Sequence, residues 1–257
     1  MVKVRLLHGD CLEWIPRLPK HSVDLVFCDP PYGTIKEGRL KGIDQLIPPS
    51  KMWEAFRHVL KPSGTVVWFG SQPFISQAIC ANLDHFRYDL IWRKMQSGFL
   101  NCNNRPLKEH QTIAVFSERA PVFNPQMEPG TPYLVRRNGK SDVYKRGRTP
   151  LGVNESGNRF PSSVLTFKQA GRRNVHPFEK PLPLCEWIVR TFTHPGMAVL
   201  DPTFGGGSSG VACRVLGRSY IGIEQDRDWF IVGRDRILTT PEPAKIQALM
   251  DLAQCGD

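Results

Sequence analysis

The stretch VDLVFCDPPYGT, residues 23–34, runs from a short apolar segment directly into two consecutive prolines. Residues 23–28 have the length and composition of a buried β-strand. Because proline has no N–H for a sheet ladder and fixes its own φ, the strand is expected to end at Asp29. The prolines then form a rigid turn that presents one carboxylate, backbone carbonyl groups and the ring of Tyr32 at a strand end.

A second stretch of the same kind, VLDPTFGGGSSG, occupies residues 199–210 and reads as a strand, an acid, a glycine-rich turn and a helix start. Glycines let the backbone approach a ligand, and Glu224 ends the next apolar segment, where an acid can hold ribose hydroxyls. The stretch lacks the Gly-Lys-Ser/Thr of a phosphate loop and does not match GxGxxG. An ordinary tight turn explains the glycines alone, but not the combination with two acids.

Apolar segments typical of strands recur at residues 2–7, 23–28, 65–69, 88–92, 111–116, 197–200 and 220–223. Most are separated by segments with apolar residues at helical spacing: 50–64, 71–83, 180–192, 208–217 and 228–238. This alternation predicts an α/β fold with a parallel sheet covered on both faces. Ser50 is expected to cap the first of these helices, and Pro62-Ser63-Gly64 to end it. Between 88–92 and 111–116 no good helix is found, which predicts a more antiparallel edge.

The composition limits the class of protein. The chain has 257 residues, 40% of them hydrophobic, which is enough for one large domain or for a domain with an insertion. No run of 18 apolar residues and no signal-peptide pattern occurs, which predicts a cytoplasmic protein without a membrane span. The seven cysteines show no CxxC spacing, so reduced thiols are expected, with no disulfide framework and no metal site.

Positive charge is concentrated in one part of the chain. The formal net charge is +10, and residues 117–174 contain eleven Lys or Arg against four Asp or Glu, a net +7. This segment is also rich in Gly, Pro and Asn and contains no clear helix, so it is expected to be a long functional or disordered segment. A binding surface for a polyanion and a solvated basic loop explain the charge equally well.

The two stretches together resemble the S-adenosylmethionine-dependent DNA amino-methyltransferases. The order of DPPY, basic segment and cofactor loop is similar to their beta class, and so are LLHGDC, KEHQTIAVF and HPFEKPLPLCEWIVR. The resemblance implies a Rossmann-like seven-stranded methyltransferase sheet that is circularly permuted and carries an inserted target-recognition region. Strands 197–200, 220–223 and 2–7 would then be the first, second and third of that sheet, and both stretches would end adjacent central strands. The implied divisions are a catalytic half at 1–116, the insertion at 117–174, a cofactor-binding half at 175–240 and a tail at 241–257.

The resemblance also implies roles for individual residues. The catalytic group would be Asp29, Pro30, Pro31 and Tyr32. The S-adenosylmethionine site would comprise Asp10, Cys11, Asp29, Lys180, Asp201, Phe204, Gly205, Gly207, Ser208, Ser209, Glu224 and Gln225, with Lys180 near the carboxylate end of the cofactor. The DNA-binding residues would be Arg136, Arg137, Lys140, Lys145, Arg146, Arg148, Arg172 and Arg173. Trp92 or Phe99 would stack on the target base, unless both are ordinary core aromatic residues.

The function expected on this basis is site-specific methylation of adenine N6 in double-stranded DNA, with the base flipped out of the helix. Cytosine-N4 methylation of DNA, amino-methylation of RNA and a non-catalytic DNA-binding protein on the same fold are the alternatives. Double-stranded DNA is the expected partner. A monomer or a homodimer, with or without a cognate restriction endonuclease, is compatible with the sequence.

Overall fold

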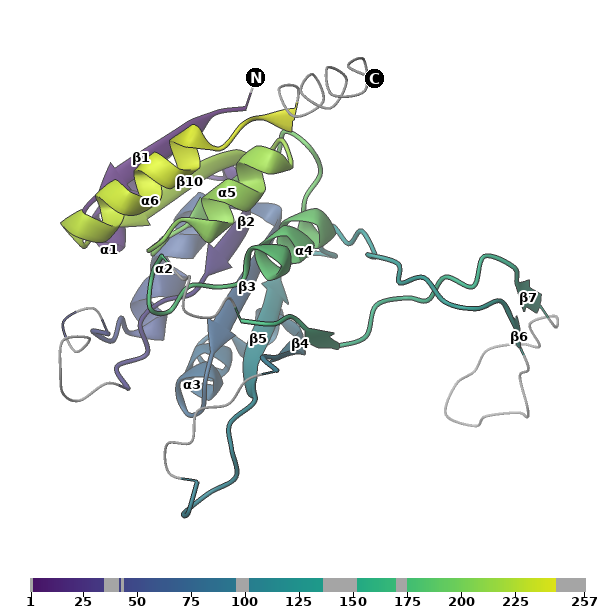
Figure 1. Ribbon diagram of the computed structural model, residues 1–257. Helices are drawn as coiled ribbons and strands as arrows, with labels where there is room; N and C mark the ends of the chain where they lie inside the picture. The colour runs from purple at the N-terminus through teal and green to yellow at the C-terminus, as the bar shows by residue number, and fades with distance from the viewer. Residues whose placement is uncertain are drawn as a thin grey trace, which may run out of the picture. The chain divides into compact units, whose positions relative to one another are not determined.

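A mixed β-sheet forms the centre of the larger unit of the chain (Figure 1). The structure is a computed structural model and describes residues 2–34, 42, 44–95, 102–135, 152–169 and 175–243. Within these residues the sheet has eight strands in the order β1-β10-β9-β2-β3-β5-β4-β8. Their bounds are β1 Val4–His8, β2 Val23–Cys28, β3 Leu60–Gly70, β4 Phe86–Arg93, β5 His110–Ser117, β8 Val164–Thr166, β9 Ala198–Asp201 and β10 Ser219–Glu224.

Neighbouring strands of the sheet are parallel, except that β5 pairs antiparallel with both of its neighbours, β3 and β4. All seven strands that the apolar pattern predicts are confirmed. The antiparallel pairing of 88–92 with 111–116 is confirmed as well, but the edge position is wrong, because β8 pairs with β4 on its outer side. The sequence misses β8 because its three residues are too few to show a period.

Helices cover both faces of the sheet, because residues that alternate along each strand point to opposite faces. Leu25 and Phe27 pack in one core with residues of α4 Leu182–Phe192, α5 Ser208–Val215 and α6 Arg227–Thr239. Val26 and Cys28 pack in the other core with the helices of the N-terminal half. These are α1 Cys11–Trp14, α2 Pro49–Val59 and α3 Phe74–Cys80, and the short 3-10 helices are η1 Ile15–Arg17 and η2 Leu83–His85.

The start of α2 differs from the sequence-based expectation. The helix begins at Pro49 with Pro48 as its N-cap, and no side chain caps it. Ser50 is therefore not a cap but a residue of the first turn. Proline at the first helical position accounts for this, since its fixed φ suits the helix and its missing N–H needs no partner. The helix passes directly into β3 at Leu60, so Pro62-Ser63-Gly64 lies in a strand rather than ending the helix.

The second compact unit is Pro125–Ser162. Its described residues contain an antiparallel pair, β6 Tyr133–Val135 and β7 Gly152–Asn154. The guanidinium of Arg159 lies 4.4 Å from the centre of the Tyr133 ring, and Glu128 and Arg159 form an isolated antiparallel bridge. The expected insertion 117–174 contains this unit and also β8, which pairs with β4 of the main sheet.

None of the helices in the described part of the chain is long and apolar enough to cross a membrane. The cysteines described, namely Cys11, Cys28, Cys80, Cys102, Cys185 and Cys213, are free thiols.

Candidate active site

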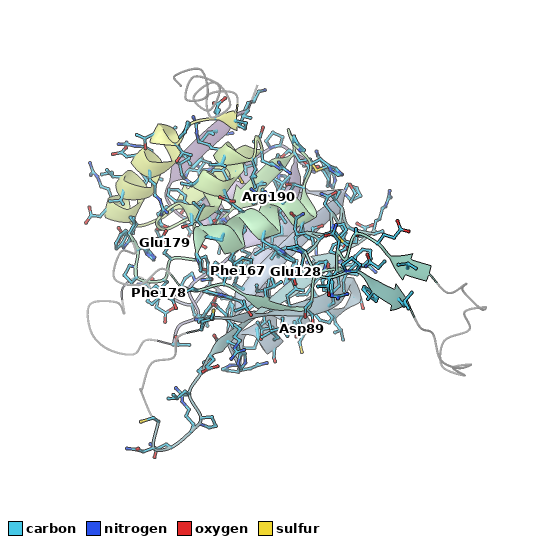
Figure 2. All side chains as sticks on the ribbon, turned by 45° about the vertical axis from the view of Figure 1, so that its right-hand side comes forward. Asp89, Glu128, Phe167, Phe178, Glu179 and Arg190 are labelled. Carbon is cyan, nitrogen blue, oxygen red and sulfur yellow. The ribbon has the colours of Figure 1, made fainter. Side chains whose placement is uncertain are left out.

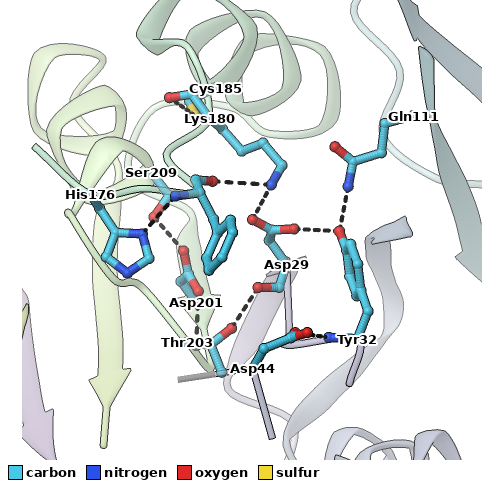
Figure 3. A network of polar contacts seen from close by, with 11 residues as sticks. Asp29, Tyr32, Asp44, Gln111, His176, Lys180, Cys185, Asp201, Thr203 and Ser209 are labelled. Atoms are coloured by element: carbon cyan, nitrogen blue, oxygen red, sulfur yellow. Dashed lines mark hydrogen bonds and ion pairs between the residues drawn. The ribbon is translucent and has the colours of Figure 1, made fainter. Parts of the chain in front are cut away.

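The two Asp-Pro turns lie side by side, at the carboxyl ends of the neighbouring parallel strands β2 and β9. This adjacency confirms the expectation that both motifs end central strands. The hydroxyl of Thr203, in the second turn, donates a hydrogen bond of 3.0 Å to the backbone carbonyl of Asp29, in the first (Figure 3). Ligands of open α/β sheets bind at this edge.

A cavity of about 660 Å³ opens at this edge of the sheet, a volume in the range of small-molecule and cofactor sites. All four residues of the Asp29–Tyr32 turn line it. So do the expected cofactor residues except Gly207: Asp10, Cys11, Asp29, Lys180, Asp201, Phe204, Gly205, Ser208, Ser209, Glu224 and Gln225. Gly207 is instead the N-cap of α5, with a φ of 80° that a side chain would disfavour.

The carboxylate of Asp29 is held from two sides (Figure 3). One oxygen forms an ion pair with the ammonium of Lys180, and the other accepts a hydrogen bond of 2.7 Å from the Tyr32 hydroxyl. The sequence-based expectation for Lys180 was the carboxylate end of a cofactor, whereas the structure places its ammonium on Asp29. Sequence reasoning does not find this pair, because 151 residues separate its members.

Tyr32 is the donor to Asp29 because its phenol stays protonated. Burial, and then the charge of Asp29, raise the pKa of this phenol well above its usual value. The side-chain amide of Gln111, on β5, donates to the same hydroxyl. The ring of Tyr32 lies 5.1 Å from that of Phe74, centre to centre.

Asp44 fixes the turn from the other side and is a residue that sequence reasoning missed. Its carboxylate accepts backbone N–H groups of Tyr32, Gly33 and Thr34 at 2.8, 3.1 and 2.6 Å. It also accepts the Thr34 hydroxyl at 3.2 Å. A single acid ten to twelve residues further along the chain carries no periodic pattern, so the sequence offered nothing by which to find it.

Glu224 organises the glycine-rich turn. Its carboxylate oxygens accept the backbone N–H groups of Gly205 and Asp226, both at 2.8 Å. Burial raises the pKa of Glu224 above its usual value. Asp10 also lines the cavity, and its side chain caps α1 by accepting the N–H of Leu12 at 2.8 Å.

Asp201 faces a different environment from Asp29. It is 3% exposed and accepts the backbone N–H of Thr203 at 3.0 Å and the hydroxyl of Ser209. Burial raises the pKa of Asp201 from 3.8 to about 7. The Ser209 hydroxyl is in turn 2.8 Å from the hydroxyl of Tyr220, so the acid belongs to a buried polar chain.

The segment before α4 contributes two further residues that the sequence did not single out. The ring of His176 meets that of Trp229 edge to face at 4.4 Å, and both line the cavity. Glu179, labelled in Figure 2, accepts the Ser208 hydroxyl at 2.6 Å and pairs with Arg236. Although burial acts in the opposite direction, these hydrogen bonds, from Ser208 and then Arg236, lower the pKa of Glu179.

Lys94 and Trp92 lie where β4 ends, on the cavity wall. Burial, and then the nearby charge of Lys180, lower the pKa of Lys94 to about 8. Trp92 is 1% exposed and donates its indole N–H to the carbonyl of Phe167 at 2.8 Å. Phe99 lies outside the described residues, as do the eight expected DNA-binding residues, Arg136, Arg137, Lys140, Lys145, Arg146, Arg148, Arg172 and Arg173. In the described part of the chain, no group of three or more His, Cys, Asp or Glu could hold a metal ion.

A cavity with these acids at the carboxyl ends of central parallel strands is typical of α/β proteins that bind a nucleoside-containing cofactor. Residues 23–230 match the model of the N6/N4 methyltransferase family, described as DNA methylase. The chain therefore belongs to the N6/N4 DNA methylase family, whose members transfer a methyl group from S-adenosylmethionine to an exocyclic amine.

Individual relatives agree with this family. The type II methyltransferase M.HinfI of Haemophilus influenzae is 27% identical over 271 residues, covering 95% of this chain and 71% of the relative. The type II methyltransferase M2.DpnII of Streptococcus pneumoniae is 26% identical over 256 residues, covering 91% and 90%.

Solved structures share the fold. The M1.HpyAVI–SAM complex has a TM-score of 0.62 at 23% identity, over 91% of this chain and 98% of that one. The cytosine-N4-specific PvuII DNA methyltransferase has a TM-score of 0.63 at 18% identity, over 100% and 94%.

Proposed function

We propose that the protein is a site-specific DNA adenine-N6 methyltransferase that acts on a flipped-out adenine in double-stranded DNA. The observation that carries this proposal is the placement of the Asp29–Tyr32 turn beside the Asp201–Phe204 turn, on the wall of one cavity of about 660 Å³. The names of M.HinfI and M2.DpnII, both type II methyltransferases, support a place in restriction-modification.

The chemistry of the turn fits methyl transfer to an amine. When bound, S-adenosylmethionine supplies an electrophilic sulfonium methyl group. The exocyclic amine of a base is a weak nucleophile, because its lone pair is delocalised into the ring. Asp29 and the carbonyl of Pro30 accept hydrogen bonds from the two amine hydrogens, which localises the lone pair on nitrogen. The two prolines hold these acceptors in place before the base arrives, so little reorganisation is needed during the reaction.

The base itself is held by the ring of Tyr32, which lines the cavity next to Asp29. A planar aromatic side chain can stack on a base that has left the duplex. Trp92 is our candidate for a second contact with the base, since it lines the same cavity.

The cavity has the groups that S-adenosylmethionine requires. Asp10 and Cys11 would contact the adenine, and Glu224 with Gln225 the ribose hydroxyls. The methionine part would lie along the second turn, whose residues are Asp201, Phe204, Gly205, Gly207, Ser208 and Ser209. Each carboxylate oxygen has two acceptor sites, so Glu224 can accept a ribose hydroxyl while it keeps its bonds to the backbone.

The strand order supports a circularly permuted methyltransferase sheet. We assign β9, β10 and β1 as its first three strands, so that the chain begins with the third strand, at the edge of the sheet, and supplies the first two with its last strands. In this assignment residues 117–174 are the target-recognition region, and the basic residues there contact DNA phosphates. The same assignment divides the methyltransferase domain into a catalytic half, 1–116, and a cofactor-binding half, 175–240.

Adenine is preferred over cytosine because the motif begins with Asp, as is common in adenine enzymes of this family, whereas cytosine enzymes mostly have Ser. The larger ring of adenine also offers more area to Tyr32. Cytosine-N4 methylation is the second candidate, and the similarity of fold to the cytosine-N4-specific PvuII enzyme favours it.

The test is to incubate the chain with duplex DNA and methyl-labelled S-adenosylmethionine, digest the DNA to nucleosides and separate them by mass. Label in N6-methyldeoxyadenosine is expected, and the Asp29→Ala variant is the inactive control. Label mainly in deoxycytidine would transfer the assignment to cytosine N4. Label found only with RNA substrates would replace the substrate class.

A further inference from the structure

Both oxygens of the Asp29 carboxylate are occupied by side chains of the protein itself (Figure 3). Lys180 forms an ion pair with Oδ2, and the Tyr32 hydroxyl donates to Oδ1. Each carboxylate oxygen keeps one further acceptor site, so the amine of a base can share an oxygen of Asp29 with its present partner or displace that partner. The surroundings of the two partners indicate which of them gives way more easily.

Lys180 is poorly placed to leave. Its side chain is 8% exposed, and its ammonium lies 5.2 Å from the centre of the Phe69 ring and 3.5 Å from the carbonyl of Phe178. Among the described residues, the ammonium of Lys180 forms its ion pair with Asp29. Separating a buried cation from its counter-charge is expensive, since neither ion regains full hydration.

The Tyr32 hydroxyl is better placed to move. It is uncharged and protonated, and it already has a second partner in the amide of Gln111. It can turn from Asp29 and keep the hydrogen bond from Gln111. Its hydrogen bond to the Asp29 carboxylate involves one charge, whereas the pair with Lys180 involves two opposite charges.

We propose that Lys180 is a positioning residue for methyl transfer: it holds Oδ2 of Asp29 and reserves Oδ1, now held by the Tyr32 hydroxyl, for the amine of the target base. This inference rests on the proposed function. The Tyr32 hydroxyl is then a placeholder that keeps the acceptor oriented until the base replaces it. The role differs from the cofactor contact that the sequence suggested for Lys180.

The pH dependence of the reaction separates these two roles. The charge of Asp29 also favours a higher pKa in six other titratable groups around it. These are Cys28, Tyr32, Lys94, His176, Cys185 and Asp201. Lys180 is the cation in direct contact with the carboxylate. Removing a cation in contact with a carboxylate favours the protonated form of that acid, which is a poor acceptor. Loss of Lys180 should therefore move the acidic limb of the rate profile to higher pH.

The experiment compares Lys180→Met, Lys180→Arg and Lys61→Met by single-turnover methylation of duplex DNA across pH. Lys61 is the matched control, because it also forms an ion pair with an aspartate, Asp24 of β2, at 2.7 Å. Unlike Lys180, it does not line the cavity. For Lys180→Met we expect a rate at least about tenfold lower at neutral pH and an acidic limb about one pH unit higher. Lys180→Arg should restore the limb, and Lys61→Met should match the wild type.

Affinity for S-adenosylmethionine, measured by calorimetry, provides the second readout and shows that the variants are folded. It should change by less than about threefold in Lys180→Met, which is under about 0.7 kcal/mol. A large loss of affinity with an unmoved acidic limb would assign Lys180 to the cofactor and overturn the proposal. An unmoved limb with unchanged affinity would overturn it as well. Methyl transfer by the wild-type chain tests the proposed function separately, because the inference is read from the ratio of each variant to that rate.

Discussion

Two turns with the same pattern, Asp29-Pro30-Pro31-Tyr32 and Asp201-Pro202-Thr203-Phe204, end neighbouring parallel strands and yet hold their acids in different surroundings. The side chain of Asp29 is 18% exposed and pairs with a cation. Asp201 is 3% exposed and is satisfied by neutral donors, and burial raises its pKa to about 7. The motif alone therefore does not determine the role of an acid at a strand end. The groups that other elements bring to it decide whether it is a charged acceptor or a buried part of the scaffold.

The aromatic residues of the two turns differ in the same way. The hydroxyl of Tyr32 connects Asp29 to Gln111, so this ring belongs to a polar chain. Phe204 is 5% exposed, and its ring centre lies 5.9 Å from that of Phe230 on α6. Both turns line the cavity, but the ring of Tyr32 carries a polar contact to Asp29, whereas the ring of Phe204 packs in the core.

The largest effect that tests this comparison is expected when each acid is replaced by the amide of the same shape. Asp29→Asn should lower kcat by at least about 100-fold, because the change replaces a charged, preorganised acceptor of the amine by a neutral amide in which one oxygen has become a donor. Asp201→Asn, in the matched position of the other turn, should act mainly on cofactor binding. Both are measured by steady-state methylation of duplex DNA. Equal losses of kcat in the two variants would show that the turns do not divide the work in this way.

Glu224 tests the cofactor side of the comparison. Glu224→Ala should weaken S-adenosylmethionine binding by about tenfold, or about 1.4 kcal/mol, because a charged acceptor for hydroxyl groups is lost. It should leave kcat at saturating cofactor much less affected than Asp29→Asn does. Calorimetry measures the affinity, and Glu186→Ala, an acid of α4 that does not line the cavity, is the control. An affinity equal to that of the wild type would remove Glu224 from the cofactor site.

The raised pKa of Asp201 makes a prediction about stability. In the unfolded chain this acid loses its proton near pH 4, whereas in the folded chain it keeps the proton up to about pH 7. The folded state thus binds more protons in this window, and the contribution of Asp201 to the free energy of unfolding falls as pH rises from about 4 to about 7. Asp201→Asn removes this term, so the stability of the variant relative to wild type should rise by up to about 1.4 kcal/mol per pH unit there.

Urea unfolding at several pH values measures this difference. Asp24→Asn, near the start of the neighbouring strand β2, is the control for a carboxylate whose partners are a lysine and a backbone N–H. A pH-independent difference between Asp201→Asn and the wild type would mean that Asp201 ionises normally in the folded chain.

The smallest effect is expected where the two turns touch. Thr203→Val removes the hydroxyl that donates to the carbonyl of Asp29 and keeps the shape of the side chain. A neutral hydrogen bond contributes about 1 kcal/mol, so a drop of this size in the free energy of unfolding and a loss of about two- to fivefold in kcat are expected. Thr239→Val, on α6 and away from the turn, is the control. No change in kcat would show that the turns are positioned independently.

Much of the larger unit was predictable from the sequence, because its physical causes are local. All seven expected strands are found, since buried parallel strands read as apolar runs ended by proline, glycine or an acid. The pairing of the two Asp-Pro turns followed from the rule that central strands of α/β sheets carry ligand sites at their carboxyl ends. The errors lay at element ends: Pro49, not Ser50, begins α2, and β8 was too short to leave a pattern.

The sequence by itself determined the layered α/β fold, the two turns and most of the residues that line the cavity, because apolar periodicity and proline act over a few residues. Only the tertiary structure decided what surrounds the acids. Lys180 contacts Asp29 across 151 residues of sequence, and Gln111 contacts Tyr32 across 79. The carboxylate of Asp44 accepts the backbone N–H of Tyr32. Such contacts depend on strand order and on burial, and these form only when the whole sheet is assembled, so no local pattern in the sequence records them.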